Sequence, residues 1–220
     1  MIWFMLSGNN SHKVFLITLF CFALFKNKVC GQTEQTYYSS GVLKTTGNKD
    51  VQGKQGMWKY FYPSGKINST ENYKNGQLEG LMTTFYPDSV LKSVENWSQG
   101  ILQDSAFYYF ESGQLRRKGI YKDGLYQGLW LSYRESGIIK SEGSYLNGLP
   151  DGQWLIYSEQ GVLIQEGDYK LGKEDGFWKY YDDNGMPNYQ GRYKNGKEVG
   201  PWYKFNKKGK KKLFETYPED

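Results

Sequence analysis

The stretch YKLGKEDGFW, residues 169–178, is followed 24 residues later by YKNGKEVGPW, residues 193–202. Both stretches begin with Tyr, carry Gly three and seven positions later, and end with Trp nine positions after the Tyr. The same spacing recurs upstream from Tyr121 and from Tyr145. Self-similarity at a fixed period of this length is the sequence signature of a repeat protein. This stretch therefore decides the architecture.

The period extends over most of the chain. Counting every unit from its Trp position, the units begin at Trp58, Met82, Ala106, Trp130, Trp154, Trp178 and Trp202, without insertion or deletion. Each unit has an aromatic residue at +3, Gly or Ser at +7 and Tyr or Trp at +15, and the first five have an aliphatic residue at +9. A degenerate copy with Tyr37, Gly41 and Leu43 precedes them. Residues 32–220 therefore form an array of about eight repeats.

One unit has the pattern of a β-hairpin. The aromatic stretch 58–62 favours a strand, and Pro63-Ser64-Gly65 interrupts it. A second extended stretch follows to Tyr73, and Asn75-Gly76 is a dipeptide that suits a turn with positive φ. A single hairpin is marginally stable in water, but stacked hairpins stabilise one another through neighbour contacts. The sequence predicts an all-β fold, an extended single-layer antiparallel sheet of stacked 24-residue β-hairpin repeats.

The spacing also predicts how side chains divide between the two faces. Alternation places the Trp position and the +3 aromatic on opposite faces. We expect the +3, +9 and +15 residues to share one face, with the Trp on the other face or re-aimed by a β-bulge. Glycines at +13 are expected to leave room for the indole rings: Gly119, Gly143, Gly167 and Gly191.

The first 31 residues differ from the array. Val14 to Phe25 is a twelve-residue apolar run preceded by Lys13. The run is too short to span a bilayer, which needs roughly 20 residues, and fits the apolar region of a secretory signal peptide. We expect residues 1–31 to be a signal peptide cleaved before Gln32, and the protein to be exported to the periplasm, cell envelope or extracellular space. An uncleaved anchor is the alternative.

Composition excludes several function classes for the array. The only His and Cys residues are His12, Cys21 and Cys30, so residues 32–220 contain none. This excludes His-based triads, Cys nucleophiles, disulfides and His or Cys metal sites there. The formal charge of +5 includes three lysines and no acid from residues 1–31, which leaves +2 for the array. Nucleic-acid binding needs a dense basic stripe, so no nucleic-acid partner is expected.

The charged residues of the array are interpreted structurally. Carboxylates recur at turn positions and are expected to be solvated turn residues, not a convergent catalytic pair: Glu79, Asp151, Glu174, Asp175 and Glu198. A basic run near the C-terminus is interpreted as a solvated cap that discourages end-to-end sheet growth, with a lipid site as the alternative: Lys207, Lys208, Lys210, Lys211 and Lys212. We expect no catalytic residues, no cofactor, no metal site and no enzyme activity.

The repeated element of an aromatic followed by two glycines, with the Trp and the turn glycine after it, resembles the MORN repeat in its bacterial variant form. It occurs at residues 73–80, 121–128, 145–152, 169–176 and 193–200. The resemblance implies an extended β-hairpin scaffold that dimerises or binds proteins, with lipid binding proposed for some members and no catalytic residues to carry over. The copy at 97–104 departs, with Asp104 for the second Gly and Ala106 for Trp, and predicts a kink or irregular hairpin.

The +2 position varies along the array, as a surface that recognises a partner would. Its aromatic members are the binding candidates Tyr60, Tyr108 and Tyr180; an unconstrained solvated face is the alternative. We expect a non-catalytic exported repeat scaffold that mediates protein–protein interaction, and a homodimer fits the resemblance. The alternatives are a module that binds a phospholipid membrane surface or a cell-wall glycan, and an antitoxin-like neutralising binder, since bacterial variants are often grouped with antitoxins.

Overall fold

The computed structural model describes residues 31–219, which form sixteen β-strands and no helix. Apart from Gly31, the predicted signal peptide lies outside these residues. The first eight strands are β1 (Gln32–Tyr37), β2 (Leu43–Asp50), β3 (Gly53–Phe61), β4 (Ile67–Lys74), β5 (Gln77–Phe85), β6 (Leu91–Ser98), β7 (Ile101–Tyr109) and β8 (Leu115–Lys122). The others are β9 (Leu125–Tyr133), β10 (Ile139–Leu146), β11 (Leu149–Tyr157), β12 (Leu163–Lys170), β13 (Lys173–Tyr181), β14 (Pro187–Lys194), β15 (Lys197–Phe205) and β16 (Lys211–Tyr217).

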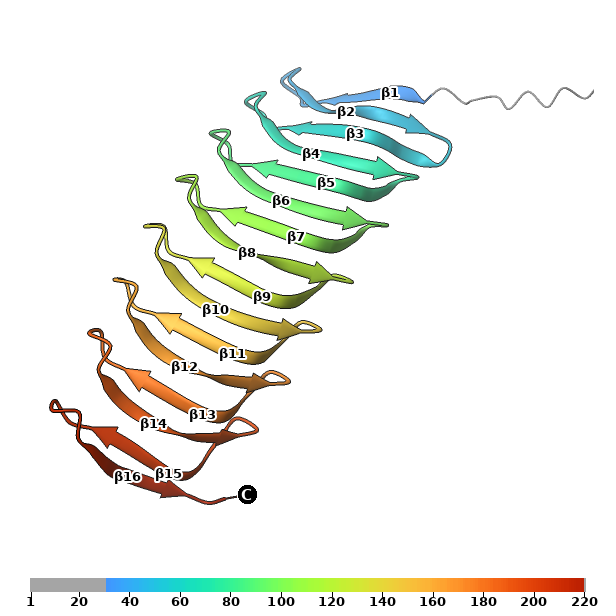
Figure 1. The fold of residues 1–220 in the computed structure, drawn as a ribbon. Helices are drawn as coiled ribbons and strands as arrows, with labels where there is room; N and C mark the ends of the chain where they lie inside the picture. Colours follow the sequence, from blue (N-terminus) through green and yellow to red (C-terminus); the bar gives the residue numbers. More distant parts are fainter. Residues whose placement is uncertain (1–30, 220) are drawn as a thin grey trace, which may run out of the picture.

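All sixteen strands belong to one open sheet in chain order, and each is antiparallel to the next. Figure 1 shows a long, curved ribbon with β1 and β16 at opposite ends and the connections along its two long edges. Within the described residues, the sheet is a single layer. The predicted fold class, an extended single-layer antiparallel sheet of stacked hairpins, is confirmed.

Two kinds of turn alternate along the chain. Two-residue turns precede the odd-numbered strands from β3 onward, and from β5 onward both turn residues have positive φ, as in Asn75 (52°) and Gly76 (77°). Two consecutive positive φ angles define the type I′ turn, whose twist matches that of antiparallel strands. Loops of five residues follow the odd-numbered strands and are closed by backbone hydrogen bonds, such as Tyr62 N–H to Lys66 O at 2.8 Å.

A β-bulge in each hairpin with a five-residue loop changes the expected division of faces. Between β3 and β4, Tyr60 pairs with Ser69 but Phe61 pairs with Ile67, so Asn68 is an extra residue. The pairing of the +3 and +9 positions is as expected. The extra residue reverses the alternation beyond it, so Tyr73 at +15 lies on the same face as Trp58. The prediction that +15 shares a face with +3 and +9 was wrong.

A second irregularity lies two residues before each Trp position, where the backbone has positive φ, as at Gly56 (62°) and Gly176 (91°). Asp104 occupies this place in β7 and adopts the same conformation, with φ of 59°. Strand β7 pairs with both of its neighbours. The kink predicted for this copy is therefore absent, because Asp tolerates the left-handed region better than most residues do.

The Trp side chains lie over the glycines of the preceding strand. An ideal Cβ on Gly167 would lie 2.1 Å from Cδ2 of Trp178, and one on Gly191 would lie 2.1 Å from Cδ2 of Trp202. The Trp178 side chain is fully buried in this way, and its indole N–H donates to Asp168 O at 3.1 Å. The predicted role of the +13 glycines is confirmed. In two repeats the next Trp is replaced, by Met82 or by Ala106. The +13 position that would face it is then Glu71 or Glu95, respectively, instead of Gly.

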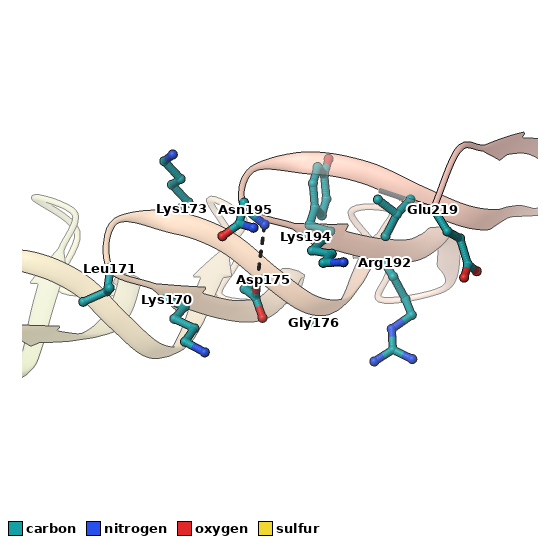
Figure 2. Close-up of a pocket in the computed structure, with 11 residues that line it drawn as sticks. Lys170, Leu171, Lys173, Asp175, Gly176, Arg192, Lys194, Asn195 and Glu219 are labelled. Carbon is teal, nitrogen blue, oxygen red and sulfur yellow. Dashed lines mark hydrogen bonds between the residues drawn. The ribbon is translucent and has the colours of Figure 1, made fainter.

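Side chains join neighbouring hairpins at the two-residue turns. Asp151 Oδ2 accepts a hydrogen bond from Leu171 N–H at 3.0 Å, and Glu79 Oε2 accepts one from Gln99 N–H at 2.8 Å. Asp175 and Asn195 make the corresponding contact, drawn in Figure 2. These carboxylates thus make exposed contacts at the turns, and each binds the backbone of the following turn, 20 residues later in the chain, which the sequence did not predict.

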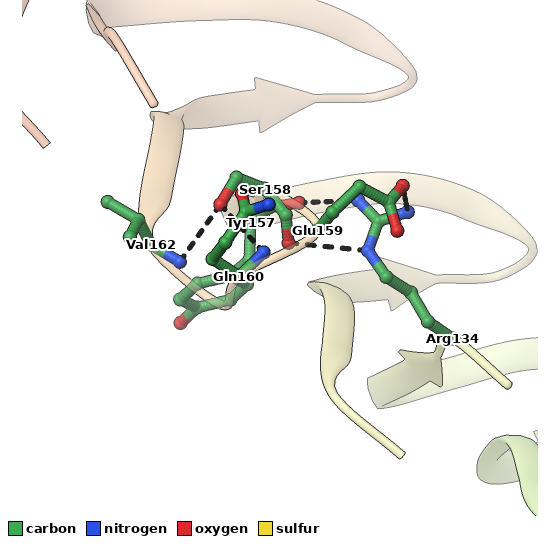
Figure 3. Close-up of polar contacts among 6 residues, drawn as sticks. All are labelled: Arg134, Tyr157, Ser158, Glu159, Gln160 and Val162. Atoms are coloured by element: carbon green, nitrogen blue, oxygen red, sulfur yellow. Dashed lines mark hydrogen bonds and ion pairs between the residues drawn. The ribbon is translucent and has the colours of Figure 1, made fainter. Parts of the chain in front are cut away.

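At the opposite edge of the sheet, the +4 residue joins neighbouring hairpins. Hydroxyls of tyrosines there donate to a backbone carbonyl of the next hairpin, as Tyr62 does to Phe85 O at 2.7 Å. Arg134 takes this role further along, donating to Tyr157 O at 2.8 Å and Ser158 O at 3.3 Å and pairing with Glu159 (Figure 3). At the next copy the residue is Ser158, whose hydroxyl accepts from backbone N–H groups of its own loop.

Candidate binding site on the aromatic face

The face that carries the Trp positions together with the +2 and +15 residues is called the aromatic face. Its rings form a ladder along the sheet, with edge-on contacts between centroids 5.3 Å apart for Tyr145 and Trp154, 5.4 Å for Trp154 and Tyr169, and 5.2 Å for Tyr169 and Trp178. These separations suit the aromatic quadrupole, which favours edge-to-face pairs at 4.5–7 Å. The repeated frame thus holds a rigid row of rings.

The three predicted binding tyrosines all lie on the aromatic face. Tyr108 is only 8% exposed, and Tyr60 and Tyr180 are partly buried. Each shares a hydrogen bond with the hydroxyl of the +15 Tyr of its own hairpin: Tyr60 with Tyr73 at 3.2 Å, Tyr108 with Tyr121 at 3.1 Å and Tyr180 with Tyr193 at 3.3 Å. The structure does not bring the three candidates together, since they belong to different hairpins.

The first of these tyrosine pairs encloses a lysine. Lys54 Nζ lies 4.7 Å from the ring centroid of Trp58, 4.7 Å from that of Tyr73 and 5.1 Å from that of Tyr60. It also donates a hydrogen bond to the Tyr60 hydroxyl at 2.5 Å. An ammonium is attracted to the negative faces of aromatic rings. This lysine occupies the −4 position, which sequence reasoning did not single out.

The second pair binds an arginine of the same chain. The guanidinium carbon of Arg117 lies 4.3 Å from the ring centroid of Tyr108, and Arg117 Nη1 donates to the Tyr126 hydroxyl at 3.0 Å. Arg117 comes from the +11 position of β8, which pairs with Tyr108 across the sheet. Both hairpins therefore place one of their own cations on the +2 tyrosine.

The third pair has the same rings but different surroundings. Its −4 residue is Glu174, whose carboxylate accepts a hydrogen bond from the Tyr169 hydroxyl at 3.3 Å. Burial, the hydrogen bond to Tyr193 and the Glu174 charge all raise the pKa of Tyr180. Burial and Glu174 raise the pKa of Tyr169 to about 12. The phenols therefore stay neutral at physiological pH.

Two hollows adjoin the aromatic face, one beside Tyr193 and the other beside Tyr108. The larger, of about 760 Å³, lies near β13–β15 and is lined by Lys170, Lys173 and Arg192 together with acidic side chains. Figure 2 shows Lys173 pointing to the opposite side from Lys170 and Arg192, so these cations do not converge on a single anion. The smaller, of about 300 Å³, includes Glu95 and Tyr108, beside the Trp position that Ala106 occupies.

Residues 31–219 contain neither a metal-binding cluster nor a membrane-spanning helix. Among residues 31–219, no group of three or more His, Cys, Asp or Glu side chains is arranged to hold a metal ion. That range also contains no helix of the length and hydropathy needed to cross a membrane. In the basic run near the C-terminus, Lys211 Nζ lies 3.7 Å from the ring centroid of Tyr203, so this lysine packs on the sheet.

Comparison with known families fits this geometry. The family model described as MORN repeat variant matches residues 54–75, 105–123, 126–147, 150–171 and 174–195. This chain is a MORN-repeat protein. The matches begin at the −4 position in four of the five cases, and each full-length match covers one strand, its five-residue loop and the strand that follows. In this MORN protein, the copy that begins near Leu78 is unmatched and the copy with Ala106 is matched in shortened form.

Among curated proteins, none matches the sequence. Solved structures that match include complexes described as TcdB2-TccC3-Cdc42, TcdB2-TccC3-TEV and TcdB2-TccC3. Identities are 12%, 12% and 11%, and TM-scores are 0.19, 0.21 and 0.18. Each match covers 79% of this MORN protein but only 12% or 13% of the other chain. At these TM-scores the likeness supports no conclusion about function.

Proposed function

We propose that this MORN-repeat protein is an exported, non-catalytic scaffold that binds another protein along its aromatic face. The observation that carries the proposal is the ring ladder itself, a rigid frame on one face of a single-layer sheet. On this frame the +2 and −4 residues differ between hairpins, as Lys54 and Glu174 do. Rigid aromatic side chains supply binding area at low cost in conformational entropy, and the variable residues supply specificity.

The non-catalytic part of the proposal is supported by the residues available. The array has no His or Cys. Glu79 and Asp151 accept hydrogen bonds from backbone N–H groups of neighbouring turns, and such contacts are structural. Export depends on the segment 1–31 acting as a signal peptide, and would place the partner in the cell envelope or outside the cell.

Site-specific photocrosslinking in native cells tests the proposal. A benzophenone amino acid is placed at Ile156, a +2 residue on the aromatic face, or at the adjacent Leu155, which points to the opposite face. We expect a discrete protein adduct from position 156 and none from position 155. Equal adducts from both positions, or no protein adduct from 156, would overturn the proposal. An adduct with lipid or glycan alone would instead support the membrane-surface or cell-wall alternative.

A further inference from the structure

The smaller hollow, of about 300 Å³, lies at a junction between hairpins that lacks the usual pair of Gly and Trp. At every Trp position that carries Trp, the hairpin before it has Gly at +13. At the hollow these two positions are Glu95 and Ala106, which pair across the sheet. A Trp at position 106 would lie over residue 95, which lines the hollow. The missing ring therefore leaves the space open, and Glu95 belongs to residues 76–104, which the family model does not match.

One repeat earlier the same glycine is replaced by Glu71, and there the chain itself satisfies the carboxylate. Glu71 accepts a hydrogen bond from the Ser69 hydroxyl at 2.9 Å and another from the Tyr73 hydroxyl at 2.5 Å. The two donors bind different oxygens of the carboxylate. Glu71 is therefore a structural residue, and it serves as the internal comparison for Glu95.

The Glu95 carboxylate has different neighbours. The serine at +11, Ser93, shares a hydrogen bond with the Thr84 hydroxyl at 2.7 Å. The +15 residue is Trp97, whose side chain has no hydroxyl. Among residues 31–219, the buried indole N–H of Trp97 has no hydrogen-bond partner, whereas buried polar atoms in proteins nearly always have one. An unpartnered donor, close in the chain to a carboxylate whose usual donors are engaged or replaced, indicates that a further molecule completes the hydrogen bonding here.

Tyr108 forms a rigid wall of the hollow. It is 8% exposed, its hydroxyl shares a hydrogen bond with that of Tyr121 at 3.1 Å, and the guanidinium carbon of Arg117 lies 4.3 Å from its ring centroid. Burial, the hydrogen bond to Tyr121 and the Glu95 carboxylate raise the pKa of Tyr108. Its hydroxyl therefore stays protonated beside Glu95. A wall fixed in this way is typical of a ligand site that is formed before the ligand binds.

Two cations line the hollow on the side of the five-residue loops. Lys92 on β6 and Arg116 on β8 both occupy the bulged +10 position, directly after the loop. Lys92 lies three residues before Glu95, which corresponds to roughly 10 Å along the strand. The hollow thus has positive charge at its loop end and a carboxylate at its inner end.

We infer that this hollow binds a sugar acid, a ring of monosaccharide size that carries one carboxylate and several hydroxyls. The ligand carboxylate pairs with Lys92 and Arg116, and ligand hydroxyls donate to Glu95. A simple carboxylate or an aspartate of a partner protein has no hydroxyl for Glu95, and a neutral sugar leaves the two cations without an anion. A volume of about 300 Å³ is at the lower limit for ligand pockets, which suits a single ring. This small-molecule site is separate from the protein binding proposed above.

Binding is measured with full-length protein labelled with ¹³C in the tyrosine rings. The protein is titrated with glucuronate, galacturonate, glucose and acetate, at neutral pH and constant ionic strength. We expect a saturable shift of the Tyr108 ring signal with at least one of the two sugar acids, and binding at least tenfold weaker for glucose and acetate. No saturable shift with either sugar acid, or binding of glucose or acetate within tenfold of the sugar acid, would overturn the inference.

Glutamate is the control for a different occupant. It carries a carboxylate for the cations and an ammonium that is able to pair with Glu95, but no hydroxyls. We expect it to bind at least tenfold more weakly than the sugar acid. Binding of glutamate as tight as that of the sugar acid would assign the hollow to amino acids and refute the inference.

Three single substitutions test the residue roles. Arg116→Gln removes a cation from an exposed side chain, and Glu95→Gln removes the carboxylate charge at nearly constant size. Each is expected to weaken binding of the sugar acid at least fivefold, whereas Glu71→Gln, the matched control, is expected to leave it unchanged. Unchanged binding in a folded Arg116→Gln or Glu95→Gln protein, or an equal loss in a folded Glu71→Gln protein, would contradict the inference.

Restoring the usual pair provides the opposite test. The double variant Glu95→Gly with Ala106→Trp is expected to raise the melting temperature and to abolish binding, because the new ring lies over residue 95. Stability gained as a binding site is lost is the usual relation between the two properties. A folded double variant that still binds the sugar acid would sink the idea, and if this variant does not fold, Arg116→Gln still decides. Photocrosslinking from position 156 is a separate readout, so the scaffold proposal and the sugar-acid site fail or stand independently.

Discussion

The contact between each +13 glycine and the next Trp makes Gly167→Ala the sharpest test of the fold. The new Cβ would lie 2.1 Å from Cδ2 and 2.3 Å from Cε2 of Trp178, which no side-chain Cβ tolerates. The Trp178 side chain is fully buried, so its ring cannot shift within the sheet and has to leave its place. In an ordinary strand interior the same change would stabilise the protein by roughly 0.5–1 kcal/mol.

The size of the effect follows from what the indole loses. Removing a buried Trp side chain costs about 3–5 kcal/mol, and the hydrogen bond from its indole N–H to Asp168 O, at 3.1 Å, contributes about 0.5–1.5 kcal/mol of that. We therefore expect Gly167→Ala to lower the free energy of unfolding by about 3–5 kcal/mol, close to the cost of Trp178→Ala. The displaced ring should also emit at longer wavelength, since it becomes exposed to water.

Urea unfolding followed by circular dichroism measures the free energy, and a double-mutant cycle isolates the contact. In a Trp178→Ala background, Gly167→Ala should cost nothing or slightly stabilise the protein, because no ring remains to collide with the Cβ. The reasoning is refuted if Gly167→Ala costs the same in both backgrounds, or less than about 1 kcal/mol in the wild type.

Three further changes test other parts of the structure. Leu171 has φ of 49° and is exposed, so Leu171→Asn should stabilise the protein by about 0.5–1 kcal/mol in urea unfolding; a loss of stability would contradict this. Arg134→Ala should cost about 1–2 kcal/mol because two backbone carbonyls lose their donors, whereas Glu159→Ala should cost less than about 0.5 kcal/mol because that side chain is 73% exposed; equal costs would be inconsistent with these roles. Burial and Glu142 raise the pKa of Tyr157 to about 12, so its contribution to stability is present below the ordinary phenol pKa of about 10 and is lost as pH rises toward 12. Unfolding at pH 9 and pH 12 should show this loss, Tyr157→Phe should reduce it, and an unchanged loss in that variant would argue against the assignment.

Much of the fold could be predicted from the period alone, but the division of faces could not. The residues that bulge out of register are mostly ordinary polar surface types, such as Asn68, Lys92 and Arg116, and these types do not mark a bulge in a sequence. No glycine or proline marks these positions, so simple alternation assigns the +15 tyrosines to the wrong face. By contrast, Gly143 could be related to the indole rings from its spacing, because only the absence of a Cβ explains a glycine repeated within a strand.

The candidate site was found only in part for a related reason. The variable +2 position identified Tyr60, Tyr108 and Tyr180, and each proved to belong to a ring pair. The three tyrosine pairs differ in the charged residue beside them. This residue is Lys54, at the −4 position, for the first pair and Arg117, at the +11 position, for the second. The −4 residue lies before the positive-φ irregularity of its strand, so its place over the rings does not follow from counting residues. The sequence signal available for this residue was the variation of residue type at the −4 position among the repeats.

The pairing of each glycine with the Trp eleven residues later sets how repeats can be exchanged between such proteins. If the chain is divided at a Trp position, Gly167 and Trp178 fall into different blocks. A block that begins with Trp could then not follow a block that has Glu71 at the +13 position. The block that transfers intact begins with one five-residue loop and ends before the next, as residues 158–181 do, and keeps ring and glycine together. Recombination, natural or engineered, should therefore leave its junctions in the five-residue loops.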